Sequence, residues 1–371
     1  MLILLLSLIT FTLQKKIVSM NYTDILTGRP CAHFVFDTRC IDFDLYFNTY
    51  LPYTILDKKI ASSVGIVGLP MKIIHLESTF DVYGYNTNII LNSDIDISYS
   101  LYVTRFGIPF YADKGIGLGN KIEDESFSLV HQLYKNKKIG HLSFALEENA
   151  NANGSIHFGG IPNEEHLKLP YKGYIKIDEE LPTWGGFFNS IVYKGIEYSV
   201  NQSFIINNAL ADMLYSNDLY DKIKNDILHD LLSEYKCSSN YGTALEYLTC
   251  DKNISNNTEI ITFIFDNTKI HFYIKDLFDT EYNTRTFSTF CSNPYPFYNI
   301  TGVIFGINFL KLFNYTYFDF SSKTVSFYSD TIKIEGPLIT STNNIIMIFI
   351  LSSLLCGVNT FLLIYIICYN K

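Results

Sequence analysis

Residues 142–162, LSFALEENANANGSIHFGGIP, place two short apolar and aromatic runs on either side of a segment rich in Asn and Ala. The runs have the composition of β-strands, and residues 149–154 (NANANG) have the composition of a hairpin loop. Runs of the same kind recur between turn residues along the chain, among them HFVFDT, IDISYSLYV, SIVYKGIEY, EIITFIFD and KTVSFY. The sequence therefore predicts a mostly β fold built from hairpins.

Two segments have helical periodicity instead. Apolar residues recur at every third position in residues 123–134 and at every fourth position in residues 218–232, with polar residues between them. We therefore expect a few short helices among the strands.

The composition indicates a folded protein whose partners are proteins or peptides. Of the 371 residues, 48% are hydrophobic and 16% aromatic, which is enough to build a core and excludes wholesale disorder. The net charge is −9, from 37 acidic and 28 basic side chains, and no run of Lys or Arg is longer than a pair. Because nucleic-acid binding needs clustered positive charge, we expect no nucleic-acid partner.

The N-terminal end is expected to lie outside the fold. Residues 1–13 are almost wholly apolar, but a bilayer-spanning helix needs roughly 20 such residues. The segment therefore predicts a signal peptide over residues 1–19.

The C-terminal end is expected to anchor the protein in a membrane as a single-pass helix. Residues 345–368 carry no charge and are long enough to span a bilayer, and residues 369–371 form a short tail. Lys371 places that tail on the cytoplasmic side, which leaves residues 20–338 outside the cell or in the secretory lumen. A cleaved lipid-anchor signal is the alternative.

Cysteine use agrees with an oxidising compartment. Two of the seven cysteines, Cys356 and Cys368, lie in the predicted membrane segment, so at least one of the other five has no partner within the chain. Those five are Cys31, Cys40, Cys237, Cys250 and Cys291. No Cys-x-x-Cys occurs and the eight His are dispersed, so we expect neither a metal nor a cofactor. Seven Asn-x-Ser/Thr sequons predict a glycosylated surface.

Eight segments, in chain order, resemble the pepsin-like aspartic proteases from about residue 31 to about residue 328. HFVFDT resembles the strand that carries the first catalytic aspartate, and Tyr83-Gly84 followed by NTNIILNSDIDI resembles the flap hairpin over the cleft. Residues 142–162 resemble the hairpin that ends in Gly-Gly-Ile. The other similar segments are ADKGIGLGN, SFSLVHQLY, WGGFFNSIVYKGIEY, ITFIFDNTKIHFYI and GVIFGINFLKLFNYTYFDFSSKTVSFY.

The resemblance implies an all-β, bilobal fold, with one lobe over about residues 20–175 and the other over about residues 176–338. It also implies a monomer that holds a peptide or protein ligand in the cleft between the lobes. Each lobe is expected to bring a catalytic loop against a glycine, Asp37 against Gly117 and Asn207 against Gly306.

The catalytic positions implied by the resemblance are Asp37 in the first lobe and Asn207, within FIINNA, in the second, and Tyr83 and Gly84 are implied as flap residues. Family chemistry needs two carboxylates that share one proton, so that one activates water while the other donates to the carbonyl oxygen. An amide does neither. We therefore expect a catalytically inactive homologue that binds peptides or proteins.

Two alternatives remain open at this point. One is an active aspartic endopeptidase of the secretory pathway or cell surface, with Asp212 or Asp279 as the second acid. The other is a scaffold whose outer face binds a partner.

The first motif also departs from the family's Asp-Thr-Gly-Ser, since Arg39 and Cys40 replace the Gly and Ser. The resemblance implies a disulfide between Cys250 and Cys291. Cys40 and Cys31 form a second candidate pair.

Overall fold

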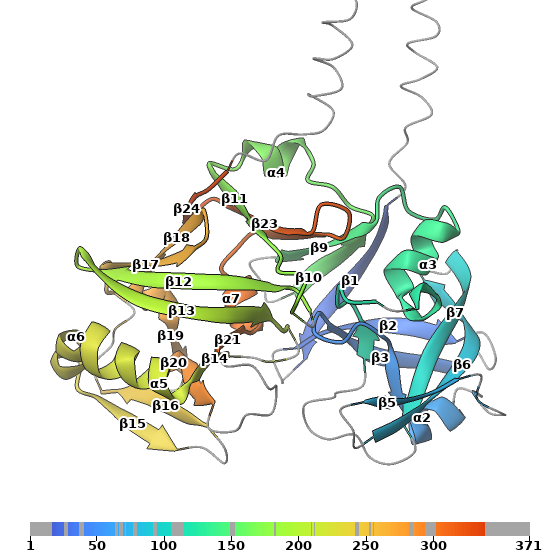
Figure 1. Ribbon diagram of the computed structural model, residues 1–371, viewed down its shortest axis with the longest axis horizontal. Helices are drawn as coiled ribbons and strands as arrows, with labels where there is room; N and C mark the ends of the chain where they lie inside the picture. Colours follow the sequence, from blue (N-terminus) through green and yellow to red (C-terminus); the bar gives the residue numbers. More distant parts are fainter. Residues whose placement is uncertain are drawn as a thin grey trace, which may run out of the picture. The chain divides into compact units, whose positions relative to one another are not determined.

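The computed structural model describes residues 17–337, with gaps at residues 26–28, 37–40, 64–65, 67–69, 71, 77–79, 92–94, 105–114, 123, 149–152, 182, 209, 211, 242–244, 252–253, 255, 282–284 and 294–301 (Figure 1). Most of the predicted signal peptide and the whole predicted membrane segment lie outside the described residues. No helix in the described part is both long and apolar enough to cross a bilayer.

The first of two large β-sheets has thirteen strands and draws on both ends of the chain (Figure 1). Its order is β11 (Tyr171–Lys176), β23 (Thr324–Ser329), β22 (Tyr315–Asp319), β9 (Ser143–Glu148), β10 (Asn153–Phe158), β1 (Val18–Ile25), β2 (Arg29–Phe36), β3 (Ile41–Asn48), β8 (Gly115–Gly117), β4 (Ile55–Asp57), β7 (Ile95–Thr104), β6 (Phe80–Leu91) and β5 (Lys72–Leu76). The late strand β22 thus pairs with β9, and β23 lies between β22 and β11, so this sheet joins distant parts of the chain.

The second sheet has eleven strands, all from the C-terminal half. Its order is β15 (Cys237–Tyr241), β16 (Glu246–Cys250), β20 (Arg285–Asn293), β14 (Met213–Ser216), β21 (Gly302–Phe305), β13 (Ile196–Ile206), β12 (Gly185–Tyr193), β17 (Ile260–Phe265), β18 (Thr268–Tyr273) and β24 (Lys333–Glu335), with β19 (Phe278–Glu281) paired to β20 alone. The mostly β, bilobal fold expected from the sequence is confirmed.

The predicted hairpin and both helical segments are also present. β9 and β10 pair antiparallel across residues 149–152, with Gly154 opposite Glu148. The first helical segment contains a 3-10 turn, η1 (Glu125–Phe127), and α3 (Leu129–Lys135). The second contains α5 (Asn217–Lys222), a π-helical turn, η2 (Ile223–Ile227), and α6 (His229–Glu234). The remaining short helices are α2 (Lys58–Ser63), α4 (Glu164–Lys168), η3 (Ile274–Leu277) and α7 (Ile307–Leu310).

β1 lies in the interior of the first sheet, between β10 and β2. Val18 is paired with Phe158 of β10 and is buried, and Met20 is buried as well. β1 therefore includes Val18 and Ser19, two residues that the sequence analysis placed in the signal peptide.

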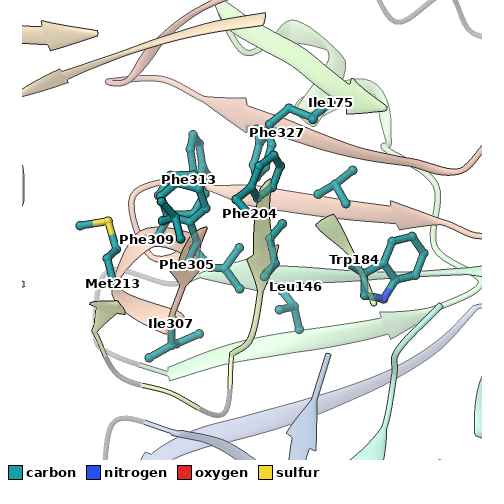
Figure 2. Packing of buried hydrophobic residues seen from close by; sticks show 14 of the residues in the cluster. Leu146, Ile175, Trp184, Phe204, Met213, Phe305, Ile307, Phe309, Phe313 and Phe327 are labelled. Carbon is teal, nitrogen blue, oxygen red and sulfur yellow. The ribbon is translucent and has the colours of Figure 1, made fainter. Parts of the chain in front are cut away.

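The core is rich in aromatic side chains, as the high Phe content requires (Figure 2). Phe305 stacks on Phe309 with ring centroids 4.2 Å apart, and Phe309 meets Phe327 edge-on. Aromatic pairs of this kind add about 0.5–1.5 kcal/mol each beyond the burial of their area. Trp184 is fully buried, and its indole N–H donates to the carbonyl oxygen of Leu118 at 2.6 Å, so its polar atom has a partner.

The disulfide differs from the expected one. Cys237 and Cys250 are directly opposite each other on the antiparallel strands β15 and β16, and they form the bond. Cys291, on β20, faces Tyr247 rather than Cys250, and its thiol is free and buried. The predicted bond between Cys250 and Cys291 is therefore wrong, because the strand register brings Cys237 to Cys250 instead. Cys31 and Cys40 are not described at the side-chain level.

Candidate functional site

The ends of two strands, one from each sheet, meet through a reciprocal set of hydrogen bonds. The Thr49 hydroxyl donates to the carbonyl oxygen of Ile206 at 3.0 Å and accepts from the backbone N–H of Asn208 at 3.1 Å. The backbone N–H of Thr49 donates to Asn208 Oδ1 at 2.8 Å. All three residues are buried. These hydrogen bonds hold the loops after β3 and β13 together, and we call this contact the junction. Asn48, the last residue of β3, and Asn207, the residue after β13, lie at the junction.

The two strand ends are built to a similar plan. β3 runs parallel to β8, with Asn48 opposite Gly117, and β13 runs parallel to β21, with Ile206 opposite Phe305. The backbone N–H of Asn207 then donates to the carbonyl oxygen of Phe305 at 2.9 Å. In each sheet a strand that ends in an apolar residue followed by Asn lies beside a parallel strand.

Glycine is required where these parallel strands approach other backbone. A Cβ atom on Gly117 would lie 2.3 Å from the carbonyl carbon of Tyr53, and one on Gly302 would lie 1.9 Å from the carbonyl oxygen of Ser203. Neither distance is possible for a real side chain, so glycine at both positions is needed for close packing.

Gly117 was expected to pack against Asp37, and this contact stays a prediction. That glycine lies beside Asn48, whereas β2, the strand that leads to Asp37, pairs with β1, β3 and β6. Asp37 itself lies outside the described residues. Sequence reasoning overlooked Asn48, although Phe47-Asn48-Thr49 has the same apolar-Asn-polar pattern as the stretch around Asn207.

The amide groups of Asn48 and Asn208 have defined orientations. Asn48 Oδ1 accepts from the backbone N–H groups of Tyr50 at 2.9 Å and Leu51 at 3.2 Å, and Asn208 Oδ1 accepts from Thr49. A backbone N–H can donate to an amide oxygen but not to an NH₂ group. The atom that faces these N–H groups is therefore Oδ1 in both residues, and Nδ2 points the other way. Within the described part of the chain neither Nδ2 atom has a hydrogen-bond partner, and both atoms are buried.

The described side chains that contact the junction residues in the following bonds and clusters are neutral. The Thr183 hydroxyl donates to the carbonyl oxygen of Thr49 at 2.5 Å. Tyr50 is half-buried and packs against two apolar clusters, one around Tyr53 and Tyr102 and one around Ile205 and Ile304. Further half-buried apolar side chains pack against the second cluster, namely Leu181, Leu210, Leu245 and Tyr247. The junction thus combines amides and hydroxyls with apolar side chains.

The two acids considered as substitutes lie in different settings. Asp212 Oδ1 accepts from Asn308 Nδ2 at 3.1 Å. Asp279 lies opposite Phe287 in β19, which pairs only with β20.

The expected flap residues lie within a strand. Tyr83 and Gly84 belong to β6, where Tyr83 is opposite Ile73 of β5 and Val103 of β7. Tyr83 is half-buried. The turn between β6 and β7 falls in residues 92–94, outside the described part. A flap function for Tyr83 stays a prediction.

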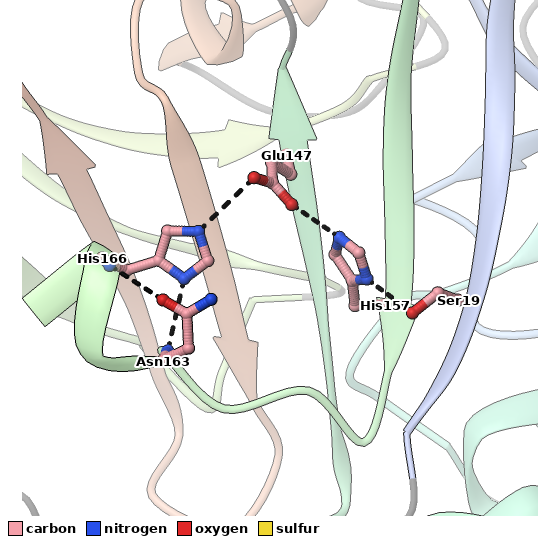
Figure 3. Close-up of polar contacts among 5 residues, drawn as sticks. All are labelled: Ser19, Glu147, His157, Asn163 and His166. Carbon is pink, nitrogen blue, oxygen red and sulfur yellow. Dashed lines mark hydrogen bonds and ion pairs between the residues drawn. The ribbon is translucent and has the colours of Figure 1, made fainter.

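A second polar cluster lies on the first sheet (Figure 3). Glu147 is flanked by two imidazoles, with His157 Nε2 2.8 Å from Oε2 and His166 Nε2 3.5 Å from Oε1. The hydrogen bond from His157, then the one from His166, lowers the pKa of Glu147 from 4.5 to about 2, against the opposing effect of burial. The Glu147 carboxylate therefore stays ionised at pH values well below the usual pKa of a glutamate side chain.

The outer nitrogens of both imidazoles are also held. Ser19 Oγ lies 2.8 Å from His157 Nδ1, and the backbone N–H of Asn163 donates to His166 Nδ1 at 3.3 Å. Because His166 Nδ1 accepts a hydrogen bond from Asn163, the proton of the neutral ring lies on Nε2, and Nε2 donates to Glu147. The cluster connects β1, β9, β10 and α4, and we interpret it as a structural clamp.

A similar arrangement in the second sheet supports this structural interpretation. Thr262 Oγ1 lies 2.8 Å from His271 Nδ1, and His271 Nε2 lies 3.6 Å from Glu335. A hydroxyl, an imidazole and a carboxylate in a row across neighbouring strands are thus a repeated feature of these sheets. Among the described residues, no group of His, Cys, Asp and Glu has the arrangement of a metal site.

Comparison with known proteins identifies the family. A sequence model described as "Eukaryotic aspartyl protease" matches residues 95–329. The chain belongs to the eukaryotic aspartyl protease family. The matched part includes Asn207 and the second sheet, but it begins after Asp37, Asn48 and Tyr83. The family match therefore does not show which residue of this chain stands at the first catalytic position.

Solved structures show the same fold. An aspartic proteinase from Irpex lacteus superposes with a TM-score of 0.62 at 13% sequence identity, covering 85% of this chain and 98% of that one. Basic 7S globulin from soybean gives a TM-score of 0.62 at 12% identity, covering 85% of this chain and 96% of that one. At such low identity the likeness concerns the fold alone. No curated protein matches the sequence.

Proposed function

We propose that this family member is a membrane-anchored, peptide-binding protein without peptidase activity, in which Asn48 and Asn207 occupy the two positions where the family has aspartates. The observation that carries the proposal is the reciprocal bonding of Thr49 with Ile206 and Asn208. It supports treating the two Asn residues as equivalent members of a pair. Membrane anchoring rests on the uncharged segment at residues 345–368.

An asparagine pair lacks the proton chemistry of an aspartate pair. Hydrolysis by the family needs an ionised carboxylate to take a proton from water and a protonated one to donate to the scissile carbonyl. A carboxamide neither accepts such a proton at physiological pH nor releases one. With Asn at both positions, water activation has no general base, and a bound peptide remains intact.

The rest of the junction suits binding of an extended polypeptide. Half-buried apolar side chains, among them Leu210, Leu245 and Tyr247, pack against the cluster that contains Ile205, the residue before Ile206 of the junction. Extended peptides bind by main-chain hydrogen bonds, with alternate side chains entering apolar pockets. We therefore assign apolar octapeptides as the first ligand class to test.

The experiment uses purified full-length protein in detergent and a library of N-acetylated, C-amidated octapeptides of Ala, Leu, Phe, Thr and Gly. One half of the library carries a fluorophore and quencher to report cleavage from pH 3 to pH 7, and the other half is used to measure binding. The expected result is binding of some peptides with no cleavage above the rate without protein. Cleavage that disappears in Asp37→Ala or Asp212→Ala would instead show an active endopeptidase.

A further inference from the structure

We propose further that Asn48 holds its ligand by donating a hydrogen bond from Nδ2 to a neutral backbone carbonyl oxygen of the intact peptide. This inference rests on the proposed function and adds the chemistry of recognition. The donor is Asn48 Nδ2, and the structure defines the orientation of the amide that carries it.

The hydrogen bonds of Asn48 define the orientation of its amide. Two backbone N–H groups, from Tyr50 and Leu51, bond to Asn48 Oδ1. If the amide were reversed, its NH₂ group would face both donors and lose both hydrogen bonds. Asn48 Nδ2 is therefore the limb of the amide that lacks a partner, since it has no acceptor among the described residues.

Leaving that donor unpaired has an energetic cost. Asn48 is 1% exposed, so its Nδ2 is shielded from solvent. A buried donor without a partner is unfavourable, and a hydrogen bond formed there is stronger than one in water. The Nδ2 of Asn208, across the junction, is a second buried donor of the same kind. The two amides favour a ligand that brings acceptors.

The acceptor is expected to be neutral. The groups that form the junction are the amides of Asn48 and Asn208 and the hydroxyls of Thr49 and Thr183, all of them neutral. Burying a carboxylate beside neutral donors alone is costly because its charge is not balanced. A peptide carbonyl oxygen carries no net charge and accepts from such a donor, so it fits the site better than a chain-terminal carboxylate.

The family's aspartate pair donates to a peptide carbonyl only while it holds its shared proton, and it titrates. An amide always carries its donor and does not titrate between pH 3 and pH 8. The affinity for a peptide without ionisable groups is therefore expected to change less than twofold between pH 4 and pH 7.

The decisive variant is Asn48→Asp in the full-length chain, probed with the blocked octapeptides described above. The new carboxylate can still accept from Tyr50 and Leu51, but at pH 7 it offers no donor. We expect its affinity to fall about 10- to 100-fold at pH 7. The loss should shrink as the pH is lowered, because the protonated carboxyl regains a donor. Asn136→Asp, on the exposed end of α3, makes the same chemical change elsewhere and is expected to bind like wild type.

A second measurement covers the case in which Asn48→Asp does not fold by circular dichroism. Each peptide bond of a bound octapeptide is replaced in turn by a trans-alkene, which removes the carbonyl oxygen without adding an ionisable group, and binding to the wild-type chain and to Asn48→Ala is measured. Replacement at one position is expected to weaken binding about tenfold in wild type and less than twofold in Asn48→Ala. If no position costs more than about twofold, or if folded Asn48→Asp binds like wild type, this inference fails. If wild type binds no octapeptide, the proposed function itself fails.

Discussion

Replacing Glu147 by Gln is expected to lower the free energy of unfolding by about 1–2 kcal/mol at pH 7. The wild-type carboxylate accepts hydrogen bonds from His157 and His166. Glutamine offers one acceptor and one donor, and its NH₂ group would face an imidazole N–H that the contact from Asn163 holds in place. The variant therefore loses one favourable contact of the clamp and gains an unfavourable one.

The magnitude follows from the pKa of Glu147, which lies at about 2 instead of 4.5. The difference, 4.5 minus about 2, is about 2.5 pKa units, or at most about 3.4 kcal/mol at 1.36 kcal/mol per unit. The Glu147 side chain is 36% exposed, so solvent screening reduces this to about half or less. Because the folded-state pKa is depressed, the stabilisation is complete above about pH 4.5 and is lost as the pH falls toward about 2.

Urea unfolding at pH 7, 5, 4 and 3 measures this effect. The difference in free energy of unfolding between wild type and Glu147→Gln should be about the same at pH 7 and pH 5 and fall by more than half at pH 3. Glu165→Gln, an exposed position on α4, serves as the control and is expected to change stability by less than about 0.5 kcal/mol. Equal stability of wild type and Glu147→Gln at pH 7, or a difference independent of pH, would refute the reasoning.

Four further predictions concern the junction, the disulfide, the buried thiol and Gly117. Thr49→Val leaves a buried carbonyl and a buried N–H without their partner and should cost about 1–3 kcal/mol in urea unfolding, whereas Thr49→Ser should stay close to wild type; equal losses in both would contradict the hydroxyl's contribution. Cys250→Ala opens the disulfide loop and should cost about 3 kcal/mol, measured by urea unfolding without reductant. Burial raises the pKa of the Cys291 thiol, so iodoacetamide should modify it only after unfolding, and rapid labelling of native protein would disagree. Gly117→Ala should destabilise by about 3 kcal/mol or more, and an unchanged unfolding midpoint would show that the loop can move away.

Local features of the fold were predictable from short-range patterns. The hairpin around residues 149–154 and the helical segment at residues 123–134 depend on neighbours in sequence, and both were confirmed. The four-residue spacing at residues 218–232 was also visible, but its consequence was not. A spacing of four exceeds the 3.6 residues of an α-turn, so each step drifts by about 40° around an α-helix. The π-helical turn η2 interrupts the α-helix here, and Leu219, Ile223, Ile227 and Leu231 are all buried.

The disulfide was not predictable because it depends on which strands are neighbours. Cys237, Cys250 and Cys291 all lie in the second sheet, and any two of them are possible partners on composition alone. The antiparallel register of β15 and β16 places Cys237 directly opposite Cys250. Strand register is set by packing of whole strands, which the spacing of cysteines does not reveal.

The chain's order of residues was sufficient to establish the β-rich class, the approximate positions of the strands and the likeness to aspartic proteases. These properties follow from composition and from periodicities of two to four residues. The partners at the junction required the folded molecule. HFVFDT and LYFNT both end an apolar run in a polar residue and Thr. The pairing of β3 with β8 and the hydrogen bond from Thr49 to Ile206 place the second of them at the junction. That hydrogen bond joins residues more than 150 positions apart, because burial and hydrogen bonding are satisfied across the whole fold and not within single segments.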